Sequence, residues 1–328
     1  MDLAAVFAEP LVDLGAETPA FDDIYTPSSF HGATKVGVTA QFLDNAEQYH
    51  RSYFDTGYWN FLLGNALAAA GNPEAPRRII DIGSGSGNSV IPLADRFPSA
   101  EIVATDISPQ LLVILRDFLR TRPDGNQRFG LVCVDAMAAR YQPEVADLAV
   151  GAAILHHILD PARVLASCLR ALAPGGWAIF FEPFEAGNTL LKFAYRRLVA
   201  AASSAERATP GFVFIERMLK DYKQRERPGS DPIYRELDDK WMFTRTYFER
   251  IRAAQGWAEL ITYALNVSPT GLRDQATVHL RLGAGLTAEA LPAWAWSVID
   301  EADASISDDL RKEMGQEAAV LLRKSSNH

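Results

Sequence analysis

The chain is organised around residues 79–90, which read Ile79-Ile80-Asp81-Ile82-Gly83-Ser84-Gly85-Ser86-Gly87-Asn88-Ser89-Val90. The isoleucine-rich start predicts a buried strand, and the amphipathic segment that follows predicts a helix. Three glycines at alternate positions predict a tight turn, because a backbone without Cβ bends sharply and lets a ligand approach it. The free N–H groups at the start of the helix would face that ligand. The stretch therefore predicts a site for a small, nucleotide-like molecule.

Strands and helices alternate from Arg78 to the segment 177–182. Apolar strands separated by helices are typical of a parallel sheet that is covered on both faces. We therefore predict an α/β fold with a Rossmann-like, seven-stranded, doubly wound sheet. Its first five strands are expected at 79–82, 101–106, 130–135, 146–152 and 177–182.

The remaining segments divide the chain into parts around this core. Residues 1–77 are expected to form a helical N-terminal extension, with little structure before residue 36 and helices over 36–71. The predicted core spans 78–184, and a helical cap or substrate lid spans 185–240. Residues 241–285 are expected to complete the sheet, with strands at 258–267 and 275–282. A helical C-terminal tail of two helices is expected over 286–328.

Composition narrows the class of protein. The formal net charge is −9, which argues against binding to nucleic acid, because duplex contact needs a basic face. The two cysteines lie in apolar surroundings and are interpreted as core thiols of a protein from a reducing compartment. No run approaches the roughly 20 apolar residues of a membrane span, and no secretory signal is visible. A cytoplasmic protein is expected, and the helical ends leave a homodimer open.

The glycine pattern differs from two well-known nucleotide-binding motifs. The dinucleotide fingerprint has glycines at positions one, three and six, whereas here the sixth position is Asn88. The phosphate loop of nucleotide hydrolases needs a Gly-Lys-Ser/Thr sequence, and none follows. An acidic residue, Asp81, stands two positions before the first glycine.

The chain resembles the class I S-adenosylmethionine-dependent methyltransferases of the small-molecule type. The resemblance rests on five motifs in the family's order, within 78–183. They are Asp81-Ile82-Gly83-Ser84-Gly85-Ser86-Gly87, Ala104-Thr105-Asp106-Ile107-Ser108-Pro109, Val134-Asp135-Ala136-Met137, Ala146-Asp147-Leu148-Ala149-Val150 with Ile154-Leu155-His156-His157, and Leu172-Ala173-Pro174-Gly175-Gly176. The resemblance is weaker over 241–283 and absent over 1–35, 185–240 and 287–328.

This resemblance implies S-adenosylmethionine as the cofactor. It assigns the methionine end to the glycine turn, with the backbone of Gly83 and Gly85 close to the ligand and Asp81 facing its ammonium. Asp106 would accept hydrogen bonds from the ribose hydroxyls, each worth roughly 1.5–3 kcal/mol. Ile107 and Met137 would enclose the adenine. The full set of expected cofactor residues is Asp81, Gly83, Ser84, Gly85, Gly87, Asp106, Ile107, Asp135 and Ala136.

A structural role is open for each of these acidic residues. Asp106 could cap the helix that begins near Pro109, and Asp135 could be a turn residue. Asp81 could accept hydrogen bonds from amides of the glycine loop.

The acceptor side carries weaker signals. Glu182, at the end of the fifth strand, and His157 are the candidate catalytic residues, because a carboxylate or imidazole there could take a proton from the acceptor. A loop-anchoring role is the alternative for Glu182. Tyr53, His156, Tyr195 and Arg196 are the candidate substrate-binding residues. No metal-ligand set is expected.

The predicted cap is basic in an acidic chain. Between Asn188 and Pro228 it has nine basic and four acidic residues, a balance of +5. A solvated helix face would explain this, and so would a pocket for an anionic acceptor such as a carboxylate or phosphate.

The sequence therefore predicts methyl transfer from S-adenosylmethionine to a small organic acceptor by in-line displacement. Two alternatives remain: a repurposed S-adenosylmethionine-binding protein, either a cyclase or a binding partner, and a nicotinamide-dependent oxidoreductase.

Overall fold

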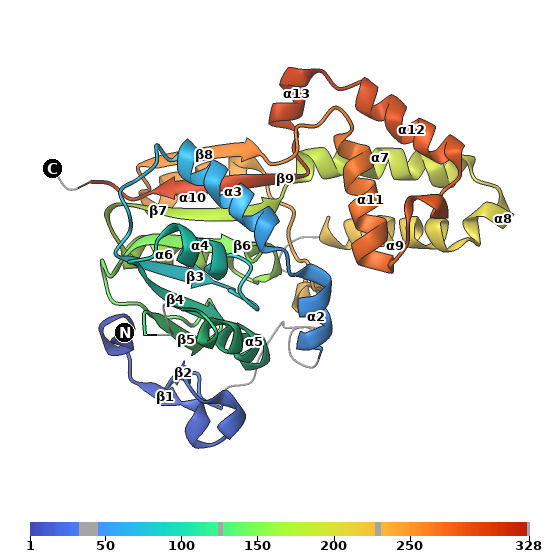
Figure 1. The fold of residues 1–328 in the computed structure, drawn as a ribbon. Coiled ribbons are helices and arrows are strands. Elements are labelled where there is room, and N and C mark those ends of the chain that lie inside the picture. The colour runs from blue at the N-terminus through green and yellow to red at the C-terminus, as the bar shows by residue number, and fades with distance from the viewer. Residues whose placement is uncertain (33–44, 124–126, 227–230, 327–328) are drawn as a thin grey trace.

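A nine-stranded sheet forms the centre of the molecule in the computed structural model, which describes residues 1–32, 45–123, 127–226 and 231–326 (Figure 1). The strand order is β1-β2-β5-β4-β3-β6-β7-β9-β8. The bounds are β1 (Leu11–Asp13), β2 (Ile24–Pro27), β3 (Arg78–Ile82), β4 (Glu101–Asp106), β5 (Phe129–Cys133), β6 (Ala146–Ala152), β7 (Leu172–Pro183), β8 (Glu259–Ala264) and β9 (Glu317–Arg323).

Strands β2 to β7 run parallel, and β1 and β9 are antiparallel to their neighbours. The order reverses between β3 and β6, since β4 and β5 lie on one side of β3 and all later strands on the other. The loops after β3 and β6 therefore meet at the carboxyl edge, where open α/β sheets bind ligands. The doubly wound α/β fold is confirmed.

Helices cover both faces of the sheet. Two hydrophobic clusters fill the space between helices and sheet, one on each face. One face is covered by α3 (Thr56–Ala69), α4 (Val90–Arg96) and α5 (Pro109–Arg120), and the other by α6 (Pro161–Ala171) and α10 (Arg245–Gln255).

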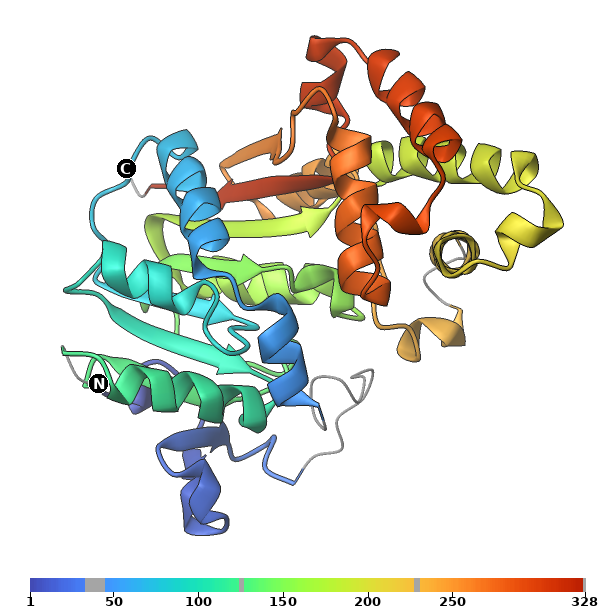
Figure 2. The same ribbon diagram turned by 45° about the vertical axis from the view of Figure 1, so that its right-hand side comes forward.

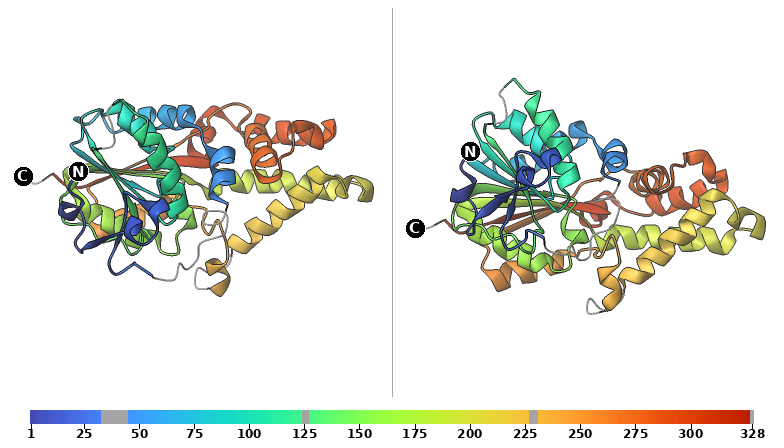
Figure 3. Two further views of the ribbon diagram at one scale, coloured as in Figure 1. Left: turned by 60° about the horizontal axis from the view of Figure 1, so that its bottom comes forward. Right: turned by 90° about the horizontal axis from the view of Figure 1, so that it is seen from below.

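A third hydrophobic cluster belongs to a separate group of helices beyond the carboxyl ends of the parallel strands (Figures 1 and 2). This helical group consists of α7 (Glu185–Ala201), α8 (Ser204–Arg207), α9 (Pro210–Arg225), α11 (Gly271–Ala284) and α12 (Ala293–Ala304). Both views of Figure 3 show it at the end of the molecule opposite the two termini. The group is therefore built from two stretches of chain that are separated by α10 and β8.

The N-terminal residues depart from the expectation of little structure. Strand β2 pairs in parallel with β5, through Ile24 and Leu131, and β1 pairs with β2. Val6 and Phe7 are buried in the core. These two strands raise the count from seven to nine. Helix α2 (Ala46–Tyr53) and α3 fall within the predicted helical segment 36–71, of which 36–44 lies outside the described residues.

The prediction of a strand over 275–282 is wrong, because these residues belong to helix α11. Ala276 and Leu280 are buried in the helical group together with Leu272. A spacing of four residues fits the even positions of a strand as well as one face of a helix. The alternation alone therefore could not separate the two structures.

The prediction of a wholly helical tail is wrong as well. After α12 and α13 (Asp308–Glu313) the chain forms β9, which lies between β7 and β8 and is antiparallel to both. Residues 318–322 are all buried, as expected for a central strand that is covered on both faces. Continuous burial leaves no alternation in the sequence, so the segment resembles a buried helix.

None of the helices in the described ranges is both long enough and apolar enough to cross a membrane.

Candidate functional site

A pocket of about 850 Å³, with the solvent at its mouth included, opens at the carboxyl edge of the sheet. It lies over the loops that follow β3, β4, β5 and β6. Six of the predicted cofactor residues line it: Gly83, Gly85, Asp106, Ile107, Asp135 and Ala136. A smaller pocket adjoins it along α2 and contains Ser84 and Tyr53.

Each glycine of the turn has a left-handed φ, but the three serve different purposes. A Cβ on Gly83 would lie 2.5 Å from the Ile154 side chain, and a Cβ on Gly87 would lie 2.7 Å from Leu115 of α5. A Cβ on Gly85 would meet nothing within 4 Å. Gly83 and Gly85 line the pocket, whereas Gly87 allows the turn to pack on α5 and lines neither pocket.

Asp106 ends β4, and its carboxylate connects the glycine turn after β3 with the loop after β4. Its Oδ2 accepts a hydrogen bond from the N–H of Gly85 at 2.8 Å, and its Oδ1 accepts one from Ser108 at 2.8 Å. The cap of α5 is the Ser108 hydroxyl, which accepts from Leu111 N–H. Asp106 therefore holds the glycine turn against the end of β4 and keeps a carboxylate at the pocket wall.

Asp81 is fully buried at the end of β3. Neither of its carboxylate oxygens forms a hydrogen bond of normal geometry with the described residues, although the nearby Ser89 hydroxyl acts to lower its pKa. Burial raises the pKa of Asp81 to about 7, and the charge of Asp106 adds to the rise. Asp81 lines neither pocket. A buried carboxylate with so few donors around it is costly, so this position favours a nearby ligand or water that brings a positive charge or a donor.

The adenine side of the predicted site is apolar, with one acidic turn. Ile107, Ala136 and Met137 line the pocket together with Leu111 and Val134. Asp135 Oδ1 accepts a hydrogen bond from the N–H of Met137 at 2.8 Å. This contact is the one expected if Asp135 is a turn residue. Burial raises the pKa of Asp135.

Helix α2 is hydrogen-bonded to the glycine turn. His50 Nδ1 lies 2.8 Å from the Ser86 hydroxyl. The Asn88 side chain donates to the carbonyl of Tyr53 at 3.0 Å and accepts from the N–H of Asp55 at 2.9 Å. The helix therefore closes one side of the site, and Tyr49 lines both pockets.

Glu182 lies at the end of β7 and is 1% exposed. Its Oε1 accepts from the N–H groups of Ile154 and Leu155, and its Oε2 accepts from the N–H of His156 and pairs with His156 Nδ1 at 2.7 Å. It does not line the large pocket. The structure therefore supplies the loop-anchoring contacts, and a catalytic role for Glu182 stays a prediction.

The two histidines that follow β6 lie in η4 (Leu155–His157) and face an acidic segment. His157 and Asp238 line the large pocket, whereas His156 does not. Burial and the neighbouring His156 lower the pKa of His157 to about 3. Burial would also lower the pKa of His156, but Glu182 and Asp239 outweigh it and raise that pKa above its usual value.

The predicted cap residues lie away from the large pocket. Tyr195 is buried in the helical group, with its hydroxyl 3.5 Å from His279 Nδ1, and Arg196 is exposed on α7. Several basic residues of this region are paired with acids: Lys192 with Glu226, Arg207 with Glu216, Arg225 with Asp239 and Arg197 with Glu301. Arg227, part of the same basic set, lies outside the described residues.

Asp238 and Asp239, which precede α10 and approach the two histidines, were not predicted from the sequence. Their only signal was a pair of adjacent acidic residues, which is the usual composition of a solvated loop. Only the return of the chain from the helical group to the sheet brings Asp238 to the pocket and Asp239 to the histidines.

The change Glu182→Gln is expected to slow turnover and to lower the melting temperature by several degrees. A glutamine has one carbonyl oxygen and cannot accept all four bonds that Glu182 now accepts, and its amide group would face backbone N–H donors. Affinity for S-adenosylhomocysteine should stay at the wild-type level, as calorimetry would measure. Wild-type turnover together with wild-type stability would contradict both the catalytic and the anchoring role.

Comparison with protein families finds a methyltransferase domain model that matches residues 80–180. Among curated proteins, trans-aconitate 2-methyltransferase of Methylobacterium radiotolerans is 40% identical over 132 residues, which are 40% of this chain and 46% of that protein. Malonyl-[acyl-carrier protein] O-methyltransferase of Methylococcus capsulatus is 34% identical over 121 residues, 37% of this chain and 42% of that protein. The chain thus spans less than half the length of these relatives.

Solved structures agree on the fold. Phosphoethanolamine N-methyltransferase 2 of Haemonchus contortus superposes with a TM-score of 0.53 at 16% identity, over 87% of this chain and 59% of that one. A protein described as a sarcosine dimethylglycine methyltransferase, from Galdieria sulphuraria, gives a TM-score of 0.50 at 13% identity, over 86% and 98%. At these identities the likeness concerns the fold alone.

Proposed function

We propose that this chain, which carries a class I S-adenosylmethionine-dependent methyltransferase domain, transfers a methyl group from S-adenosylmethionine to a small organic acceptor. The observation that carries the proposal is the pocket at the carboxyl edge of the sheet, where Asp106 and the glycine turn meet. S-adenosylmethionine supplies an electrophilic methyl group on a sulfonium, so the transfer is an in-line displacement.

The residues of the pocket suit the parts of this cofactor. The buried carboxylate of Asp81, at the end of β3, supports recognition of an ammonium, directly or through water. Asp106 keeps acceptor capacity at the pocket wall for ribose hydroxyls, because each carboxylate oxygen can accept more than one bond. Ile107 and Met137 offer apolar contact to a flat base.

For the methyl acceptor, we assign two roles. His157 would align the acceptor, and Glu182 would anchor the loop that carries His157. His157 lines the pocket, and burial favours its neutral imidazole, which can accept a hydrogen bond from an acceptor hydroxyl or amine, or donate one to it, according to the tautomer. Glu182 acts through the loop 154–156 and keeps His156 and its neighbour in place. Helix α2, with Tyr49 and Tyr53, would exclude water from the reacting groups.

An anionic acceptor is the finer proposal. The trans-aconitate and malonyl-carrier relatives act, by their names, on carboxylate-bearing molecules, and the segment 188–228 carries a local balance of +5. The ion pairs of Lys192, Arg207 and Arg225 reduce the charge that remains for a ligand. A label-transfer assay that compares trans-aconitate with phosphoethanolamine and glycine would separate anionic from amine acceptors.

Stabilisation by S-adenosylhomocysteine and not by NAD is the expected result of a thermal-shift titration. At a ligand concentration 100 times Kd the stabilisation is about 2.7 kcal/mol, enough to raise the melting temperature by several degrees. Stabilisation by NAD alone would favour the oxidoreductase alternative. Binding of S-adenosylhomocysteine without methyl transfer to any compound of a cell extract would favour a repurposed binding protein or cyclase.

A further inference from the structure

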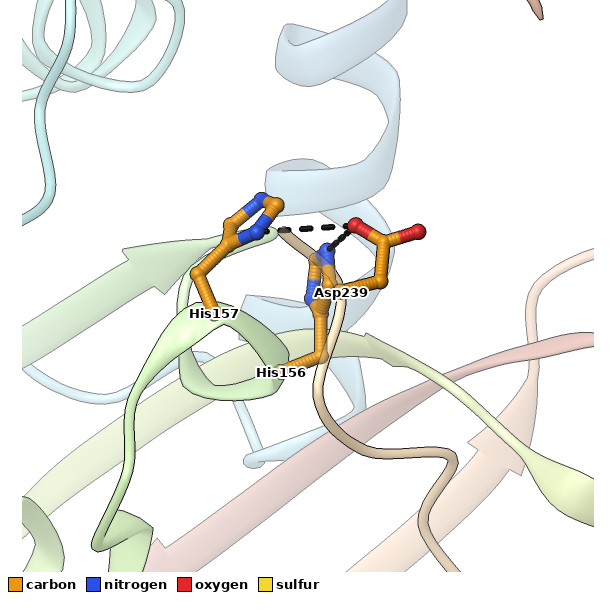
Figure 4. Close-up of side chains that lie close together, drawn as sticks. All are labelled: His156, His157 and Asp239. Atoms are coloured by element: carbon orange, nitrogen blue, oxygen red, sulfur yellow. Dashed lines mark ion pairs between the residues drawn. The ribbon is translucent and has the colours of Figure 1, made fainter. Parts of the chain in front are cut away.

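His156, His157 and Asp239 direct three donor atoms toward one point beside the large pocket (Figure 4). Asp239 Oδ1 lies 3.6 Å from His156 Nε2 and 3.5 Å from His157 Nδ1. One donor atom of each of the three residues lies within 4.8 Å of those of the other two. Two imidazoles and a carboxylate are a donor set that Zn²⁺ and related divalent ions prefer.

Neighbouring side chains hold two of these donors in place, as the outer contacts of metal sites do. His156 Nδ1 is held by the buried carboxylate of Glu182 at 2.7 Å, which leaves Nε2 to face Asp239. The second oxygen of Asp239 accepts from Arg225 at 2.7 Å, which leaves Oδ1 to face the histidines. A carboxylate behind a ligating histidine, and a donor behind a ligating carboxylate, are the usual outer contacts of such sites.

We propose that His156 Nε2, His157 Nδ1 and Asp239 Oδ1 bind a divalent transition-metal ion, Zn²⁺ by preference. With metal–ligand bonds of about 2.0–2.1 Å, tetrahedral ligands lie about 3.4 Å apart and adjacent octahedral ligands about 2.9 Å apart. The two distances from Asp239 Oδ1, 3.5 and 3.6 Å, are close to the tetrahedral value. The donor atoms of the two histidines lie within 4.8 Å of each other, so ion binding would draw these side chains together.

His157 needs one local change. Its Nδ1 lies 3.1 Å from the carbonyl oxygen of Asp238 and 3.5 Å from Asp238 Oδ1. Metal binding requires the tautomer with the proton on Nε2, after which these two oxygens become additional candidate ligands. The tautomer of a histidine is set by its partners, so the ion itself selects it.

The charged groups around the cluster favour a bound cation. Glu182, Asp238 and Asp239 supply three negative charges near the cluster, against the two positive charges of Arg225 and Lys240. With neutral imidazoles the sum is −1 before the ion enters. Because His157 and Asp238 line the pocket, an open position on the ion would face it and could take water or an acceptor oxygen.

The test is metal binding by the chelator-treated, untagged protein, measured without any methyl-transfer assay. Equilibrium dialysis against Zn²⁺, followed by elemental analysis, should give one ion per chain, and Co²⁺ should give the visible absorption of a tetrahedral site. The variants His157→Gln and Asp239→Asn should each weaken binding about 100-fold or more. The variant His31→Ala removes a histidine that pairs with Glu17 outside the cluster, and it should bind as the wild type does.

Two results would overturn the proposal: no retained ion, or wild-type affinity in both cluster variants. The cluster would then be an ion pair between His156, Asp239 and Arg225. Thermal melting of each variant shows whether it is folded, and the Co²⁺ spectrum of the wild type tests the site without any substitution. Affinity for S-adenosylhomocysteine, measured on the same samples, reports separately on the proposed function.

Discussion

Asp106→Ala is expected to weaken binding of S-adenosylhomocysteine by 100-fold or more. Two charged hydrogen bonds to ribose hydroxyls contribute roughly 1.5–3 kcal/mol each, so their sum exceeds the roughly 2.7 kcal/mol that corresponds to a 100-fold change. The substitution also removes the acceptor for Gly85 N–H, so the glycine turn loses its link to β4. Calorimetric titration with S-adenosylhomocysteine measures the loss directly.

The control for this variant is Asp95→Ala. Asp95 lies on α4, is 62% exposed and pairs with Arg122, so its removal changes the net charge by the same amount. The control should bind with wild-type affinity, since exposed ion pairs contribute at most about 1 kcal/mol. Equal affinity in Asp106→Ala and Asp95→Ala, with both proteins folded, would remove Asp106 from the cofactor site.

Asp81→Asn is expected to have opposite effects on stability and on binding. In the ligand-free protein the folded-state pKa of Asp81 is about 7, above the unfolded value of 3.8. The folded protein therefore binds more protons between these pH values, and its stability falls as pH rises from about 4 to about 7. Asparagine carries no charge, so the variant should be more stable than the wild type at pH 8, by up to about 4 kcal/mol.

Binding should change in the other direction. If the ionised Asp81 faces the ammonium of S-adenosylhomocysteine, affinity of the wild type should rise with pH through 7, and Asp81→Asn should lose both this rise and about tenfold or more in affinity at pH 8. Chemical denaturation from pH 4 to 8 gives the first quantity and calorimetry gives the second. A variant that is less stable than the wild type at pH 8 would show that Asp81 is a structural acceptor.

The core and the cofactor side could be predicted because their signals are local. A strand, a glycine turn and a helix follow one another within 79–96, and Asp106, the last residue of β4, stands at the end of an apolar run. Parallel strands place their carboxyl ends at one edge, so Asp106, Asp135 and the glycines had to meet once the strands were recognised. The pocket lining agrees with that expectation.

The acceptor side could not be predicted because it depends on distant contacts. Asp239 reaches His156 only after the chain has passed through the helical group and returned to the sheet, and Arg225 of α9 pairs with Asp239 there. The secondary structure of the buried segment 318–322 could not be predicted either. It is a strand because β7 and β8 supply hydrogen-bond partners on both sides. The backbone groups of such a segment can be paired within a helix or between strands.

The sequence by itself determined the doubly wound core, the glycine turn and the acids that face it, because periodicity and turn chemistry act over a few residues. The tertiary structure alone decided that α11 joins the helical group, that β9 lies inside the sheet, and that Glu182 supports the loop of His156. These features depend on which surfaces meet, and burial between partners far apart in the chain leaves no local pattern.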